Sequence, residues 1–135
     1  MATDSAARAS IRTSLAPWLS VRDAAKAIDF YKSAFAAAEV YRLDGEGGAL
    51  ARLSIDGAEF WVGEESPEQH NSSSASLQGS VRMILTVADP DAVFARVCRA
   101  GATEVYPVSE EHGWRIGRLK DPFGHDWEIG HDLAS

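Results

Sequence analysis

The sequence predicts an α+β fold of two β-α-β-β-β modules, which form a curved mixed sheet with the helices on its outer face. The main observation is a repeat: segments 20–23 (Ser-Val-Arg-Asp) and 86–89 (Thr-Val-Ala-Asp) each precede an amphipathic helix, 66 residues apart. The register continues downstream, where Gly57 to Gly63 matches Gly124 to Gly130 after one inserted residue. Because a duplicated module places a binding site between its copies, the residues that line this seam bear on function.

Each predicted helix has a start signal and an apolar stripe. Asp23 is a good N-cap for the first helix; Asp89 caps the second, with Pro90 at its first position and Gly101 at its end. The stripes are Ala27, Ile28, Tyr31, Ala34 and Phe35 in the first helix, and Val93, Phe94 and Val97 in the second. Both helices are therefore expected to cover a sheet.

Short segments bounded by Gly or Asp are the expected strands. In chain order they are 15–21, 39–43, 49–55 and 58–63, followed by 81–87, 103–108, 113–120 and 125–130. Each half of the chain thus has the same order of elements.

The length of 135 residues, 45% of them hydrophobic, allows one domain with a real core. Residues 1–13 are small, polar and aperiodic, so we expect a flexible N-terminal arm. Residues 14–135 form the single domain, with modules 14–64 and 81–131 joined by a polar linker, 65–80.

The charge of −7 argues against nucleic acid or an anionic membrane as a partner, because either would need an exposed cluster of Lys and Arg. No apolar run is long enough to span a bilayer, and a cytoplasmic location is the expectation. The single Cys98 cannot form an internal disulfide and is assigned no role.

Strand alternation predicts which residues lie on the sheet face away from the helices. In the first strand of the first half, the residues expected to face the helices are Pro17, Leu19 and Val21. In the first strand of the second half they are Val81, Met83, Leu85 and Val87. The opposite face then carries Trp18, Arg52, Glu59, Trp61, Arg82, Ile84, Arg118, Asp126 and Glu128. A face that mixes Trp, Arg and carboxylate resembles the wall of a pocket.

A simpler interpretation of the same charges is that they form ion pairs on a solvated sheet. Arg82 with Glu128, and Arg52 with Glu59, are the candidate pairs. The tryptophans favour the pocket, because a Trp on this face has no helix to pack on and is covered only by a ligand or a subunit.

Three features together resemble the vicinal-oxygen-chelate superfamily, which contains glyoxalases, bleomycin-resistance proteins and extradiol dioxygenases. They are the paired modules, the Val-x-Asp helix start followed by Ile28-Asp29-Phe30-Tyr31, and the segment 121–129 (Asp-Pro-Phe-Gly-His-Asp-Trp-Glu-Ile). The resemblance covers residues 15–131. It implies a glyoxalase/bleomycin-resistance-like fold, and it also implies association of two chains, so a homodimer is expected.

The resemblance also implies where a metal would bind, at four positions that correspond to Ala16, Trp61, Arg82 and Glu128. Only Glu128 can be a ligand, and a guanidinium at Arg82 would repel a cation while attracting Glu128. Glu59 and Asp126 could build a displaced oxygen site, but nothing in their spacing requires it. We therefore expect neither a metal nor another cofactor. His125 is expected to have a structural, hydrogen-bonded role.

The sequence therefore predicts a metal-free protein that holds a small organic ligand in the cup of the sheet. The expected ligand-binding residues are Trp18, Arg52, Glu59, Trp61, Arg82, Trp114, Arg118, Asp126 and Glu128. The alternative is a glyoxalase-like lyase, isomerase or dioxygenase, with Glu128 as the candidate base and either an atypical divalent metal or an arginine beside it. A pure interaction module is a third possibility.

Overall fold

The computed structural model describes residues 13–65 and 81–133. The predicted arm (1–13) and linker (65–80) lie outside these residues, apart from Thr13 and Glu65. The first module contains β1 (Trp18–Val21), α2 (Ala24–Ala34), β2 (Ala38–Gly45), β3 (Gly48–Ile55) and β4 (Ala58–Glu64). The second contains β5 (Arg82–Thr86), α4 (Pro90–Arg99), β6 (Thr103–Glu111), β7 (Trp114–Lys120) and β8 (Asp126–Asp132). The predicted order of elements is confirmed in both halves.

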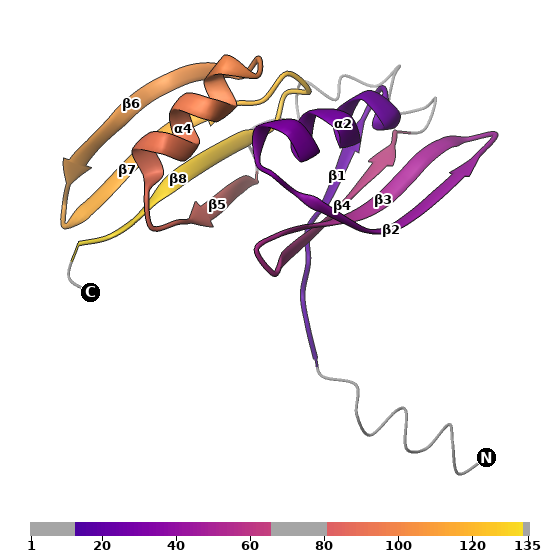
Figure 1. Ribbon diagram of the computed structural model, residues 1–135, viewed down its shortest axis with the longest axis horizontal. Helices are drawn as coiled ribbons and strands as arrows, with labels where there is room; N and C mark the ends of the chain where they lie inside the picture. Colours follow the sequence, from indigo (N-terminus) through magenta and orange to yellow (C-terminus); the bar gives the residue numbers. More distant parts are fainter. Residues whose placement is uncertain (1–12, 66–80, 134–135) are drawn as a thin grey trace, which may run out of the picture.

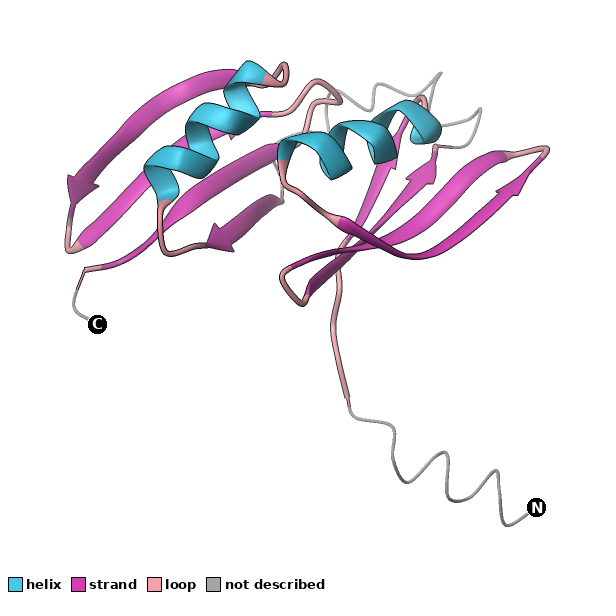
Figure 2. Cartoon of the chain, viewed as in Figure 1, coloured by secondary structure: helices cyan, strands magenta, loops and turns pink. Residues whose placement is uncertain are grey.

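The two modules form two four-stranded mixed sheets with the same topology. Their strand orders are β1-β4-β3-β2 and β5-β8-β7-β6, and in each the first strand is parallel to the last strand of its module. Both helices lie on one side of the two sheets (Figures 1 and 2). The predicted α+β architecture, with helices on the outer face, is therefore confirmed. We call the other side of each sheet the helix-free face.

The helices begin where the sequence predicts. The side chain of Asp23 accepts a 3.1 Å hydrogen bond from the backbone of Lys26, and Asp89 accepts one of 3.2 Å from Ala92. Each bond satisfies a backbone N–H that a helix start leaves without a partner. In α2 the predicted stripe is fully buried. Within the described residues no helix is long and apolar enough to cross a membrane.

The core is continuous across the two modules. The indole of Trp127, from β8, stacks on Phe35 of the first module with 4.4 Å between ring centroids, and meets Phe60 edge-on at 5.7 Å. The Tyr31 hydroxyl and the Trp127 indole both donate to Oδ2 of buried Asp121, at 2.6 and 2.9 Å. The helix-free faces are thereby held in a fixed relative position.

Some predicted strand ends are wrong. β1 begins at Trp18 because its parallel partner β4 pairs only with residues from there onward, and Leu15 beyond that end is 99% exposed. Val81 precedes β5 and is exposed, so it does not face α4 as predicted. Strand β6 extends to Glu111, three residues past the predicted end, because it continues to pair with β7.

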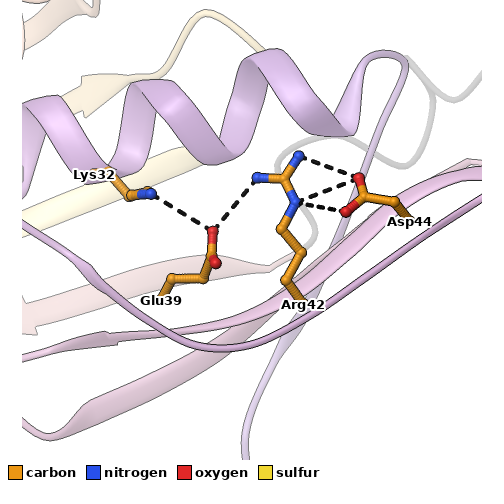
Figure 3. Close-up of polar contacts among 4 residues, drawn as sticks. All are labelled: Lys32, Glu39, Arg42 and Asp44. Carbon is orange, nitrogen blue, oxygen red and sulfur yellow. Dashed lines mark hydrogen bonds and ion pairs between the residues drawn. The ribbon is translucent and has the colours of Figure 1, made fainter.

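The outer strand β2 has charged side chains on its helix side. Lys32 from α2 and Arg42 both pair with Glu39, at 3.5 and 3.4 Å, and Arg42 also binds Asp44 (Figure 3). Charges on a strand with a free edge disfavour pairing with another chain. This network lies on the opposite side of the sheet from the candidate site.

Candidate functional site

Two equivalent rows of side chains cross the helix-free faces. Residues directly opposite on neighbouring strands point to the same face, so the pairing register defines each row. In the first sheet the register joins Trp18, Trp61, Arg52 and Tyr41, which we call the aromatic row. In the second sheet it joins Ile84, Glu128, Arg118 and Tyr106, which we call the charged row.

The aromatic row contains two nearly parallel indole rings, those of Trp18 and Trp61, which we call the platform. The rings of Trp18 and Trp61 are 6.2 Å apart between centroids and only 17° from parallel. Tyr41 meets Trp61 edge-on at 6.1 Å, and the guanidinium carbon of Arg52 lies 5.4 Å from the Trp61 ring centroid. Although large and apolar, Trp18 is 52% exposed. The platform therefore presents aromatic surface that the described residues do not cover.

The position of Trp18 depends on Gly63. The six-membered ring of Trp18 lies where a Cβ on Gly63 would be, so any side chain at this position would collide with the indole. Gly63 has an ordinary φ, so its role here is the space it leaves. The platform is thus built from β1 and β4 together.

Three members of the charged row, Tyr106, Arg118 and Glu128, line a groove of about 400 Å³ on the second sheet. Its walls come from β6, β7 and β8 and consist of Tyr106, Pro107, Ser109, Glu111, Ile116, Gly117, Arg118 and Glu128. Glu128 pairs with Arg82 at 3.6 Å, and Arg118 lies 3.9 Å from Asp126. The groove therefore has both a cationic and an anionic wall.

Arg52 and Arg118 occupy equivalent positions in the two sheets and share an unusual feature. The Nε atom of each is buried and, among the described residues, has no hydrogen-bond partner. Arg52 has Glu59 at 3.6 Å, which is an ion pair and too long for a good hydrogen bond. Buried polar atoms are nearly always satisfied in structural roles, so both arginines are candidates for function.

The nine predicted ligand-binding residues are divided between these surfaces. Trp18, Arg52, Trp61 and Glu59 belong to the first sheet, and Arg82, Arg118 and Glu128 to the second. The structure does not bring Trp114 to the platform, because Trp114 belongs to the second sheet. It is the first residue of β7, opposite Asp132, and lies roughly 13 Å along that strand from Arg118. The two ion pairs of the simpler interpretation, Arg82 with Glu128 and Arg52 with Glu59, are both present.

Asp126 contributes charge to the second sheet without offering contact surface. Asp126 is only 3% exposed. Its carboxylate forms an ion pair with Lys120 at 3.2 Å and lies 3.9 Å from Arg118. Sequence alternation assigns its face but cannot reveal that two neighbouring cations cover it.

Six residues of the groove are absent from the predicted set: Tyr106, Pro107, Ser109, Glu111, Ile116 and Gly117. Ile116 could have been found by alternation from Arg118, two residues away. Tyr106 and Ser109 lie on β6, where register shifts between 104 and 106 and between 106 and 109 break the simple alternation. Faces on that strand are therefore not readable from a period of two.

The residues at the superfamily's metal positions do not fit a divalent cation. Of Ala16, Trp61, Arg82 and Glu128, only Glu128 carries a donor atom, and the Arg82 guanidinium lies 3.6 Å from it. Across residues 13–65 and 81–133, no three His, Cys, Asp or Glu side chains are grouped so that they could hold a metal. We therefore derive no chemistry through a metal at these positions.

His125 and Cys98 carry side chains that can be reactive, but neither contributes to the candidate site. Nε2 of His125 lies 3.0 Å from the backbone oxygen of Ser20, as its predicted structural role requires. Burial, followed by the nearby carboxylate of Glu104, raises the pKa of the Cys98 thiol. A raised pKa disfavours the reactive thiolate.

Comparison with known proteins agrees with this architecture. The sequence model of the glyoxalase-like domain matches residues 18–130. The chain is 41% identical over 130 residues to the uncharacterized protein Mb0911c of Mycobacterium bovis, covering 91% of this chain and 86% of that one. It is also similar to the solved structures of the At5g48480 gene product of Arabidopsis thaliana and of TioX from Micromonospora sp. ML1.

Both solved structures have a TM-score of 0.69, and both alignments cover 90% of this chain and all of the other. Sequence identity is 30% to the Arabidopsis protein and 28% to TioX. The chain therefore belongs to the family of glyoxalase-like domains, in the vicinal-oxygen-chelate superfamily.

Proposed function

We propose that this chain is a cytoplasmic small-molecule-binding protein, which holds an organic ligand on its helix-free face without a metal. The observation that carries the proposal is the platform formed by exposed Trp18 and half-buried Trp61. Leaving half of the Trp18 residue in water costs free energy, because its indole could bury a large apolar area elsewhere. An aromatic ligand that packs on this ring, beside Trp61, recovers this free energy.

The surroundings of the platform suit a planar, partly polar ligand. Arg52 lies over Trp61 and limits the platform on one side, while Tyr41 stands edge-on to the same ring. A ligand ring placed on Trp18 would meet the guanidinium at its edge, where a polar substituent can accept a hydrogen bond. The indoles would thus select a planar ligand, and Arg52 would determine how that ligand is oriented.

At three of the four positions where the superfamily resemblance places metal ligands, the side chain cannot coordinate a metal, which supports binding without metal catalysis. Arg82 stands where the superfamily resemblance places a ligand, and it pairs with the one carboxylate that remains, Glu128. Protein purified without chelator should contain no stoichiometric divalent metal. Stoichiometric metal that is lost in Glu128→Gln would contradict this part of the proposal.

Homodimer formation belongs to the same proposal. Large apolar side chains remain exposed on the helix-free faces, among them Trp18, Tyr41, Leu43, Ile84 and Tyr106. A second copy would remove part of this surface from water and close the cup. Sedimentation equilibrium should give twice the chain mass, whereas a monomer at all concentrations would contradict it.

One observation favours enzymatic proton abstraction as a second candidate: Glu128 and Arg118 lie opposite each other in the groove. Glu128 would take a proton from the carbon beside a carbonyl, and Arg118 would stabilise the enolate oxygen. The Arg82 guanidinium lies 3.6 Å from Glu128 and occupies its carboxylate, so binding is the favoured function. Exchange of that carbon-bound proton in D₂O, lost in Glu128→Gln, would establish the enzyme instead.

The proposed binding function is tested by tryptophan fluorescence. Planar aromatic compounds that bind should quench the emission, and Trp61→Ala should weaken their binding because half of the platform is removed. Arg22→Gln, an exposed change next to α2, is the control. Unchanged affinity in Trp61→Ala would remove the platform from the site.

A further inference from the structure

Arg118 and Glu128 face each other across β7 and β8 but do not form an ion pair. They are direct partners in the strand register, a position where opposite charges normally attract. Among the described residues, however, the ion-pair partner of Glu128 is Arg82 at 3.6 Å, and that of Arg118 is Asp126 at 3.9 Å. Both side chains line the same groove. The groove therefore keeps a cation and an anion apart.

The charge of Arg118 is only weakly neutralised by the protein. Within residues 13–65 and 81–133, its buried Nε has no acceptor, and its carboxylate partner, Asp126, is closer to Lys120 at 3.2 Å. Guanidinium groups are the side chains best suited to bind carboxylates, through parallel N–H donors. Arg118 is thus a cation with unused donor capacity at the wall of a groove.

The rest of the groove suits the body of a small ligand. Tyr106, which is 63% exposed, and Ile116 supply apolar surface, and Ser109 supplies a hydroxyl. The volume of about 400 Å³ is near the lower end of ligand pockets, which run from roughly 300 to 1,000 Å³. Glu111 and Glu128 would repel a ligand that brings only negative charge.

Building on the proposed small-molecule function, we propose that this groove binds a small carboxylic acid with a hydrogen-bond donor beside its carboxylate. The carboxylate contacts Arg118, and the donor, a hydroxyl or an ammonium, contacts Glu128. The donor is required because Glu128 would repel the ligand's carboxylate, and a hydrogen bond from the ligand to Glu128 offsets this repulsion. The side chain of the acid packs on Tyr106 and Ile116.

Calorimetric titration with four matched compounds tests the ligand class. Phenyllactate and phenylalanine carry a carboxylate with a hydroxyl or an ammonium, phenylpropionate lacks the donor, and phenyllactamide lacks the carboxylate. At least one of the first two should bind with a Kd about tenfold or more below those of the last two. The better of the two identifies the donor. Equal binding of all four, or binding of none, would overturn the proposal.

Variants then assign the roles of the two charges. Arg118→Gln should raise the Kd of the preferred acid about tenfold or more, since a charge-assisted contact is lost. Glu128→Gln should strengthen phenylpropionate binding and erase the preference for a donor. Arg115→Gln is the matched control: it lies on the same strand but pairs with Asp91, on the α4 side. An Arg118→Gln protein that folds and binds the acid unchanged would contradict the assignment.

NMR of the wild-type protein gives a readout that needs no variant. The Nε–H signal of Arg118 should shift when the acid is added, while that of Arg115 stays in place. These outcomes separate the two proposals. Acid binding that depends on Arg118 without tryptophan quenching would leave this inference standing and contradict the platform. Quenching by aromatic compounds without regard to a carboxylate would do the reverse.

Discussion

The Tyr31 hydroxyl donates a 2.6 Å hydrogen bond to Oδ2 of Asp121, 90 residues away in sequence. Tyr31 lies in the C-terminal half of α2, and Asp121 begins the turn between β7 and β8, so this bond ties the first module to the second. Trp127 donates to the same oxygen. We call Tyr31, Asp121 and Trp127 the buried hydrogen-bond cluster. All three residues are buried, and the cluster fixes how the aromatic row and the charged row lie relative to each other.

We predict that Tyr31→Phe lowers the free energy of unfolding by about 1–3 kcal/mol, because Asp121 loses a buried donor. Urea denaturation followed by fluorescence measures the change. Tyr41→Phe is the control, since Tyr41 is exposed. Equal stability of the two variants would mean that the bond contributes nothing.

The same buried hydrogen-bond cluster predicts that the free energy of unfolding falls at high pH. Burial, followed by the charge of Asp121 and the hydrogen bond to it, holds the pKa of Tyr31 well above its usual value near 10. The folded state thus favours the neutral phenol. Its contribution is complete below about pH 10, where the unfolded phenol is also neutral, and is lost as the pH rises through the higher folded pKa.

The measurement compares urea midpoints of wild type and Tyr31→Phe from pH 8 to pH 11. The stability difference between them should shrink above about pH 10, because the wild type alone must keep a buried phenol protonated. A difference that stays constant over this range would contradict the prediction.

Asp121→Asn should destabilise the protein by more than Tyr31→Phe, by about 2 kcal/mol or more. Oδ1 of Asp121 accepts from the backbones of Phe123 and His125, at 2.9 and 3.0 Å, while Oδ2 accepts from the two aromatic donors. An amide has a single oxygen, so its NH₂ group would face donors on one side. Thermal unfolding measures the loss, and a melting temperature within a degree of wild type would refute this account of the turn.

Much of the fold could be predicted because its signals are local and repeated. N-caps at Asp23 and Asp89 and apolar stripes at helical spacing identify both helices, and the 66-residue repeat gives both modules the same order. The ends of the strands could not be predicted from local signals, because a strand ends where its pairing with the neighbouring strand ends. That is why β1 begins at Trp18 although the apolar alternation extends further back.

The site could be predicted only in part, for physical reasons. Alternation assigns faces, so Trp18, Trp61, Arg118 and Glu128 lie on the helix-free side as expected. Alternation does not give the partners of a strand, so it could not show that Trp114 lies opposite Asp132 in the second sheet, while the platform belongs to the first. It also reads Asp121 only as a turn residue, because the partners of its second oxygen come from distant elements.

The central claim is that the Trp18–Trp61 platform binds the ligand, and Gly63→Ala tests it most directly. The added methyl group displaces the Trp18 ring and removes no contact atom, whereas Gly45→Ala, with no atom near its Cβ, is the matched control. In quenching titrations with a planar aromatic ligand, we expect Gly63→Ala to raise the Kd about tenfold and Gly45→Ala to leave it unchanged. Identical titration curves for a folded Gly63→Ala protein and the wild type would contradict the claim.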